Sequence, residues 1–119
     1  MEANALPVDL ATMREAVDRL LDPDAVPEAL PPAAEELETL TLQIRGHLEL
    51  LLPEVEQLAV RLGKDSIPRY CALACLGEAR GKLRAQPSPV PGGDLAYARR
   101  LARALNALCD HFDALRPDC

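Results

Sequence analysis

Aromatic residues are scarce in this 119-residue sequence, which has no tryptophan, two tyrosines and one phenylalanine. Few residues therefore favour β-strands, which are enriched in aromatic and β-branched side chains. Apolar residues make up 49% and charged residues 27%, a balance typical of globular proteins and not of disordered ones. Leucine, alanine and valine must fill the interior, and at this length the chain fits one domain. We predict an all-α, four-helix bundle-like single domain.

Long hydrophobic runs are also missing. No segment approaches the ~20 apolar residues that a membrane-spanning helix needs, and no basic stretch followed by an apolar one begins the chain. We therefore expect a cytoplasmic protein that makes no contact with membranes. In that reducing compartment the cysteines, Cys71, Cys75, Cys109 and Cys119, are expected to be free thiols.

The net charge of −6 argues against nucleic acid as a partner, but the charge is unevenly distributed. Residues 1–60 carry 13 acidic and 3 basic side chains, whereas residues 61–119 carry 6 acidic and 10 basic ones. We expect the two halves to attract each other within the fold, in preference to a basic docking patch. The cluster Arg99, Arg100 and Arg103 has no interleaved aromatics and is expected to be a solvated face.

Apolar residues recur every three or four positions in four segments, and this spacing predicts helices over residues 9–21, 33–62, 67–85 and 94–115. Asp9, Ser66 and Asp94 are expected to cap the first, third and fourth helices at their N-termini. Gly63 is expected to end the second helix, and Pro53 inside it predicts a kink near residues 49–53.

The third segment has no polar face between Tyr70 and Gly77, so we expect the third helix to be the most buried. Prolines 23, 27, 31 and 32 predict an extended connector before the second helix. The chain is accordingly divided into an N-terminal helix with its proline-rich linker, residues 1–32, and a helical core domain, residues 33–119.

Cys71 and Cys75 lie one helical turn apart, with Glu78 three residues further, a spacing that would present soft ligands to zinc or copper. Strong zinc signatures contain two such pairs, and this chain contains one. Buried cysteines also act as small apolar residues. We therefore expect Cys71 and Cys75 to be packing residues, with no metal and no cofactor.

Four ionisable residues on the apolar helices are candidates for catalysis: His47, Glu78, Arg80 and His111. Each histidine borders an apolar stripe, where it would act as a base, and Glu78 or Arg80 would orient a substrate. The alternative is that these groups form salt bridges or single hydrogen bonds. If a pocket exists, we expect it between the second, third and fourth helices, bordered by His47, Glu78 and His111.

Three strings, residues 44–55, 68–80 and 98–111, resemble a family of small actinobacterial proteins, a domain-of-unknown-function family labelled as natural-product biosynthesis proteins. The resemblance covers about residues 37–113. Its most distinctive pieces are Arg45-Gly46-His47, Leu52-Pro53-Glu54-Val55 and Cys109-Asp110-His111. The resemblance implies a role in the secondary metabolism of a Streptomyces-like bacterium but does not indicate which reaction is involved. The same strings contain further polar residues that we take as candidate ligand-binding residues, namely Arg69, Tyr70, Asn106 and Asp110.

Three hypotheses for the function follow. The first is an accessory protein of a biosynthetic pathway that binds a partner protein or a hydrophobic small molecule. The second is a small cofactor-independent enzyme with an acid–base site inside the bundle, and the third, least favoured, is a metal or redox protein. A pocket where the histidines and Glu78 converge would favour the enzyme, whereas a solid core with an exposed apolar face would favour the binding protein.

Leu50 and Leu52 lie on either side of the apolar stripe of the second segment and widen its apolar surface. Unless the first helix covers them, they remain in water, and a two-fold interface is the commonest remedy. We therefore expect a homodimer, with coverage by the first helix as the monomeric alternative.

Overall fold

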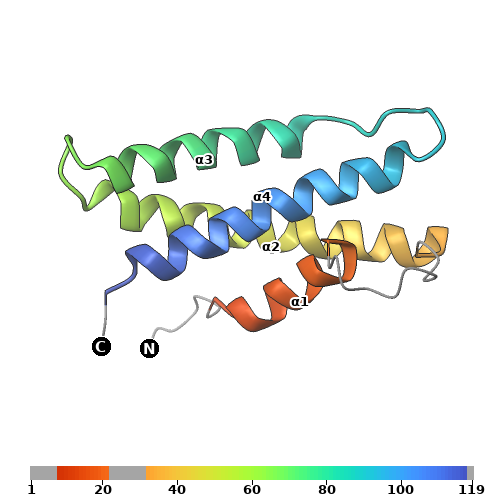
Figure 1. Cartoon of the computed structure of the whole chain (residues 1–119), viewed down its shortest axis with the longest axis horizontal. Coiled ribbons are helices and arrows are strands. Elements are labelled where there is room, and N and C mark those ends of the chain that lie inside the picture. The colour runs from red at the N-terminus through yellow and green to blue at the C-terminus, as the bar shows by residue number, and fades with distance from the viewer. Residues whose placement is uncertain (1–7, 22–31, 118–119) are drawn as a thin grey trace.

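The computed structural model describes residues 8–21 and 32–117, which form four helices (Figure 1). They are α1 (Leu10–Leu21), α2 (Ala34–Val60), α3 (Ile67–Arg84) and α4 (Gly93–Leu115). No strand occurs in these ranges, and none of the four helices is long and apolar enough to cross a membrane. The predicted all-α, four-helix architecture is confirmed, with every helix end within two residues of its predicted place. The proline-rich connector falls almost wholly outside the described residues.

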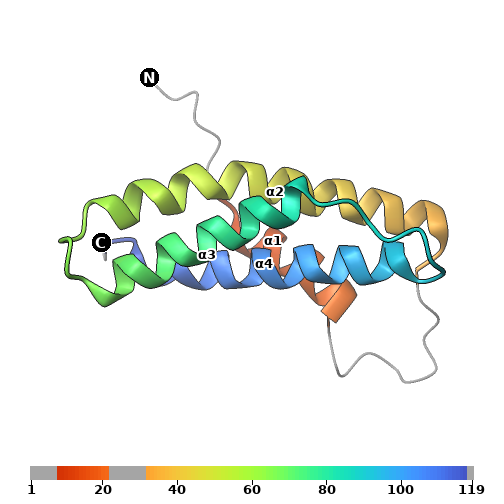
Figure 2. The same ribbon diagram turned by 90° about the horizontal axis from the view of Figure 1, so that it is seen from above.

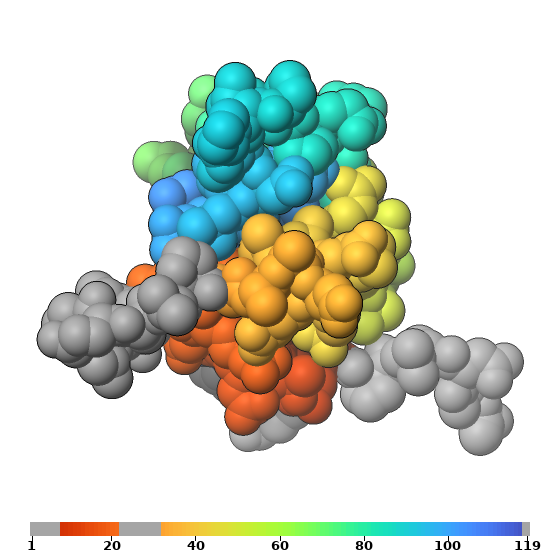
Figure 3. Space-filling view, turned by 90° about the vertical axis from the view of Figure 1, so that its right-hand side faces the viewer, coloured from red at the N-terminus to blue at the C-terminus, as the bar shows by residue number. Residues whose placement is uncertain are grey.

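The two longest helices, α2 and α4, form the centre of the molecule and run in the same direction (Figures 1 and 2). The shorter α1 and α3 run the opposite way. Both central helices contact all other helices, whereas α1 and α3 do not contact each other. Figure 3 shows the resulting order from one end: the loop between α3 and α4, then α4 and α2, then α1. The bundle therefore has α1 and α3 on opposite sides of a central pair.

Leucine and alanine dominate the core, and α4 contributes the largest share of it. Nine of its residues are buried, and Leu101, Leu105 and Leu108 are completely inaccessible to solvent. α1 belongs to the same core through Met13, Ala16, Val17 and Leu20. Apart from Tyr97, the buried residues in the described ranges are aliphatic residues, methionine, glycine and cysteine. The interior is therefore apolar.

The expectation that the third helix is the most buried is wrong. α3 buries only Ala72, Leu76 and Ala79, and that place belongs to α4. The run from Tyr70 to Gly77 has no polar face, but several of its residues are alanine or glycine and therefore small. Alanine and glycine expose little apolar area, so burial of all sides of the helix gains little free energy.

Two of the three predicted N-caps are confirmed. Asp9 accepts hydrogen bonds from the backbone N–H and the hydroxyl of Thr12, and Ser66 Oγ accepts one from the N–H of Arg69. Asp94 lies within α4 instead, because Gly92 takes the cap position with a φ of +82°. A Cβ on the next residue, Gly93, would collide with the carbonyl of Ser88. The two glycines thus let the proline-rich loop turn directly into α4.

α2 ends two residues before the predicted end. Its last residue is Val60 and its C-cap is Arg61, so Gly63 lies in the following turn and does not cap the helix. Pro53 lies inside α2 without ending it. The backbone carbonyls at this end that lack a partner within the helix accept hydrogen bonds from Arg69 of α3.

The two leucines that motivated the homodimer are covered within the chain. Leu52 is buried, and Leu50 is partly buried against the core. The covering helices leave little of either side chain for a second copy. A homodimer therefore stays a prediction, but without the surface on which it was based.

Truncation of a core leucine on α4 tests the central place of that helix. We expect Leu105→Ala to lower the free energy of unfolding by about 2–5 kcal/mol, because Leu105 is completely buried and its truncation leaves a cavity in the core. Leu42 is 64% exposed, and Leu42→Ala as the control should change stability by less than about 0.5 kcal/mol. Urea denaturation followed by circular dichroism measures both. Equal losses for the two variants would contradict the assigned core.

Candidate functional site

Three arginines bind the C-terminal ends of neighbouring helices. Arg69 of α3 donates to the carbonyl oxygens of Val60 and Leu62, at 3.3 and 2.8 Å. Arg99 of α4 donates to the carbonyl of Leu20 in α1, at 3.2 Å. A cation at this end of a helix satisfies free carbonyl groups and interacts favourably with the helix dipole. Arg69, a candidate ligand-binding residue, therefore has a structural role.

The third of these arginines, Arg45 of α2, forms a network with Tyr97 of α4 at the end of α3. Arg45 Nη2 donates to the carbonyl of Leu83 at 3.1 Å, and Nη1 donates to the Tyr97 hydroxyl. That hydroxyl donates in turn to the carbonyl of Lys82 at 3.3 Å. Sequence analysis missed both residues. The available signal was Tyr97 itself, because a tyrosine on an apolar helix face needs a partner for its hydroxyl.

Two candidate ligand-binding residues, Asn106 and Asp110, bind the same arginine. Arg14 of α1 donates to Asn106 Oδ1 at 3.2 Å and lies 3.1 Å from Asp110 Oδ1. The side chains of Arg14 and Asp110 are 36% and 65% exposed, so water screens the pair and its stabilisation is modest. These residues fasten α1 to α4, and Arg14 was not identified from the sequence.

The candidate catalytic residues lie on different surfaces. Arg80 forms a 2.9 Å ion pair with Glu56 of α2, whereas Glu78 is exposed. Residues two positions apart on a helix do not face each other. His111 lies half-buried on α4. Arg80 thus forms a salt bridge, as the alternative for these groups expected, and its catalytic role stays a prediction.

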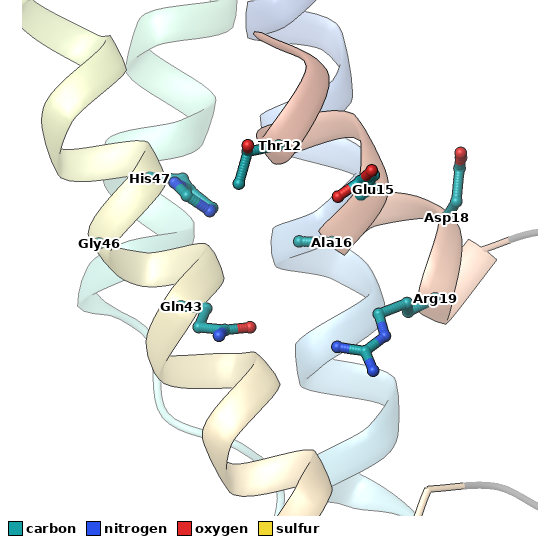
Figure 4. A pocket seen from close by; sticks show the side chains of 8 residues that line it. All are labelled: Thr12, Glu15, Ala16, Asp18, Arg19, Gln43, Gly46 and His47. Atoms are coloured by element: carbon teal, nitrogen blue, oxygen red, sulfur yellow. The ribbon is translucent and has the colours of Figure 1, made fainter. Parts of the chain in front are cut away.

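His47 faces α1 and lines a pocket of about 640 Å³ between α1 and α2 (Figure 4). Burial lowers the pKa of His47 below its usual 6.5, and the Asp9 carboxylate opposes this shift only in part. The structure does not bring Glu78 or His111 to this pocket. Its lining residues are Thr12, Glu15, Ala16, Asp18, Arg19, Gln43, Gly46 and His47.

The chemistry available in this pocket is limited. Glu15, Asp18 and Arg19 are exposed. Groups that act in acid–base catalysis commonly have pKa values that burial or a nearby charge has shifted. Burial favours the neutral form of the His47 imidazole. The two carboxylates of the pocket, those of Glu15 and Asp18, lie in contact with water.

A second pocket, with a volume of about 720 Å³, opens at the opposite face of α2, near the place between the second, third and fourth helices where a pocket was expected. The N-terminal half of α2, the residues that follow α3 and the start of α4 line it, but His47, Glu78 and His111 do not. Leu37, Thr41 and Leu42 line one side, and Pro87 and Tyr97 lie on others. This mixture of apolar and polar surface suits a small amphiphilic molecule.

Cys71, Cys75 and Cys109 belong to no cluster of metal-ligating side chains in the part of the chain that the structure describes. No group of three metal-ligating side chains occurs in residues 8–21 and 32–117. Cys71 is exposed, so its expected packing role is wrong, whereas Cys75 is half-buried and Cys109 is buried. Burial raises the pKa of the Cys75 thiol and raises that of Cys109 to about 11. These two thiols are protonated at neutral pH, and Cys119 lies outside the described residues.

α3 presents an apolar surface to solvent, which we call the outer α3 face and define as Ile67, Tyr70, Ala74 and Gly77. Their spacing of three and four places them on one side of the helix. Ile67 is 74% and Tyr70 75% exposed, and Ala74 and Gly77 are exposed as well. The outer α3 face contains no charged side chain and lies opposite the buried side of the helix.

The hydroxyl of Tyr97 supplies a test of the network at the end of α3. We expect Tyr97→Phe to lower the free energy of unfolding by about 1–2 kcal/mol, because it removes the hydrogen bonds that the hydroxyl makes with Arg45 Nη1 and with the Lys82 carbonyl. Tyr70→Phe is the matched control, since the Tyr70 side chain is exposed. Chemical denaturation compares the two variants, and an equal effect would remove the structural role of the network.

Stability should depend on the protonation of His47. Its pKa in the folded protein lies below the unfolded value of 6.5, so the unfolded chain binds the proton more strongly and stability falls as the pH falls below 6.5. Proton NMR titration of the imidazole measures this pKa directly. In parallel, His47→Gln should lose less stability between pH 7 and pH 5 than the unchanged protein. A midpoint for His47 at or above 6.5 would show the opposite sign.

Comparisons with known proteins place this architecture in a family. No curated protein and no solved structure matches the chain at a significant level. A family model described as "Family of unknown function (DUF6415)" matches residues 11–117. The match begins in α1, earlier than the resemblance over residues 37–113 implied, and includes all four helices. The chain thus belongs to this family of unknown function.

Proposed function

We propose that this chain is a non-catalytic accessory protein that binds a partner protein through the outer α3 face. The observation that carries the proposal is the exposure of Ile67 and Tyr70, 74% and 75%, on a face without charge. Large exposed apolar side chains that lie together mark interaction surfaces in soluble proteins. Tyrosine is also among the residues that contribute most to the affinity of such interfaces.

The apolar core supports binding over catalysis. The interior holds no charged residue in the described ranges. Arg69 and Arg80 are engaged with backbone carbonyls and Glu56, and Asn106 and Asp110 bind Arg14. The enzyme alternative needs an acid–base pair in a shielded site, for which His47 alone gives little support.

The biological setting of the proposal is natural-product biosynthesis in the cytoplasm of a Streptomyces-like bacterium. Its support is the resemblance of residues 44–55, 68–80 and 98–111 to proteins with that label. An accessory protein of this kind would hold or position a biosynthetic enzyme and would not itself catalyse a reaction.

A second candidate function is the binding of a hydrophobic small molecule in the pocket lined by Leu37, Leu42 and Tyr97. The supporting observation is its volume of about 720 Å³, which lies in the range of small-molecule sites. Native mass spectrometry of the purified protein distinguishes the two candidates. A bound molecule that Leu42→Arg removes and Tyr70→Arg does not would favour the second.

Candidate partners are the proteins encoded by neighbouring genes, each purified and titrated against this protein by biolayer interferometry. We expect one of them to bind, and Tyr70→Arg to weaken its binding at least tenfold, because the change puts a charge into an apolar interface. Val90→Arg is the matched control, since Val90 is 60% exposed and lies in the loop between α3 and α4. A partner that binds the Tyr70→Arg variant as tightly as the control would refute this use of the face.

A further inference from the structure

Two glycines lie in the interior of α3 with open space beside them. A Cβ built on Gly77 or Gly81 meets no atom within 4 Å. Glycine inside a helix costs about 1 kcal/mol relative to alanine. No neighbouring atom among the described residues would exclude a side chain at either position. What glycine does provide here is room for another backbone to approach closely.

The shape of this surface fits a second helix. Gly81 continues the outer α3 face by one more turn, so that the residues follow at intervals of 3, 4, 3 and 4. Fourteen residue steps at about 1.5 Å give a stripe of roughly 21 Å, or four turns. Its large side chains, Ile67 and Tyr70, stand at one end and its small residues at the other. A helix with an apolar stripe can seat against such a face along its whole length.

The flanks of the stripe, which form its rim, carry more basic than acidic side chains, with Glu78 as the one acid, four residues before Lys82. α3 carries Arg69, Arg80, Lys82 and Arg84 but only one acid, Glu78. Arg80 has Glu56 as a partner, whereas Lys82 and Arg84 form no ion pair with any residue that the structure describes. The chain as a whole has a net charge of −6. The excess of positive charge is therefore local to this helix and favours an acidic partner.

Charge and shape argue against two other occupants. A second copy packed through the same face would bring two basic rims together, which like-charge repulsion disfavours. An anionic membrane suits the charges, but an interfacial helix needs a broad apolar side to insert. Beyond Ile67 and Tyr70 this stripe offers only Ala74, Gly77 and Gly81.

We infer that the occupant of the outer α3 face is an acidic amphipathic helix of the partner protein. Its apolar stripe packs on Tyr70, Ala74 and Gly77, and its flanking Glu and Asp side chains pair with Lys82 and Arg84. This inference rests on the proposed function and adds the chemistry of the partner to it.

The probe is a fluorescent synthetic helix of about 21 residues with leucine and alanine at intervals of three and four and glutamate at the flanks. A second peptide has lysine in place of every glutamate. We expect the full-length protein to bind the acidic peptide in anisotropy titrations, and the lysine peptide at least tenfold more weakly. Raising the salt from about 0.05 M to about 0.5 M should weaken the acidic peptide's binding, because salt screens the rim. Equal binding of both peptides, or of neither, overturns the inference.

Gly77→Leu separates the surface from the stability of the fold. Leucine favours the helix more than glycine does and has open space at this position, so the variant should unfold at the same or a higher temperature. We expect it to bind the acidic peptide at least tenfold more weakly. Gly46→Leu is the matched control, since Gly46 lies inside α2, also has nothing within 4 Å, and borders the pocket beside α1. Equal affinities for the two variants overturn the inference.

Charge reversal at Lys82 and Arg84 tests the rim by itself. The double variant Lys82→Glu with Arg84→Glu should lose the acidic peptide and gain the lysine peptide. The other occupants are examined with the unchanged protein. Light scattering should give a mass that Gly77→Leu does not change, and vesicles of anionic lipid should not sediment the protein. A dimer or vesicle binding that Gly77→Leu abolishes assigns the face to that occupant and overturns the inference.

Failure of the inference is distinguishable from failure of the proposed function. In one outcome, Tyr70→Arg weakens the binding of a natural partner but the acidic peptide does not bind. The proposed function then stands, and the inference that the partner contributes an acidic helix is wrong. If the acidic peptide binds as described but natural partners ignore Tyr70→Arg, the surface has the inferred chemistry and the proposed function is wrong.

Discussion

The whole structure depends on the burial of α4 against the other three helices. Without tryptophan, and with little other aromatic volume, the core is assembled from leucine and alanine. Ala98 and Ala102 are completely buried, and small residues let neighbouring helix axes approach to the short end of the usual 8–10 Å range. Leu101, Leu105 and Leu108 are completely buried as well, on a helix that contacts α1, α2 and α3. Every other helix has its inner face against α4 and is amphipathic for that reason.

A core of this kind leaves no place inside for charged side chains, so they act at its edges. Arg45, Arg69 and Arg99 bond to carbonyls at the ends of α3, α2 and α1, where the helix dipole is negative. Arg14, on the side of α1, binds Asn106 and Asp110 and so connects α1 to α4. Arginines beside apolar helices thus resemble functional groups in the sequence while their hydrogen bonds hold the bundle together.

The same contacts position the surface that we propose as functional. α3 is held at its start by Arg69 and at its end by Arg45 and Tyr97. Its inner side buries Ala72, Leu76 and Ala79 against the central pair. The outer α3 face is therefore presented on a helix fixed at both ends. A surface held in this way needs little ordering when a partner binds, which favours affinity.

The sequence by itself determined the four helices, because helix formation depends on interactions within a few residues. Apolar spacing located each helix, and Asp9 and Ser66 cap their helices through side-chain bonds to residues three positions on. Only the tertiary structure decided which helix is central. Residues 70–77 of α3 and the stripe of α4 both look apolar in the sequence, and the difference lies in how many neighbours each one meets. The candidate site depended on the same long-range packing: His47 faces α1, Arg80 meets Glu56, and Asn106 and Asp110 share Arg14. The partners of these ion pairs and hydrogen bonds lie at least 24 residues apart in the sequence. No local pattern specifies such pairings, because they follow from the packing of helices whose relative positions the core determines.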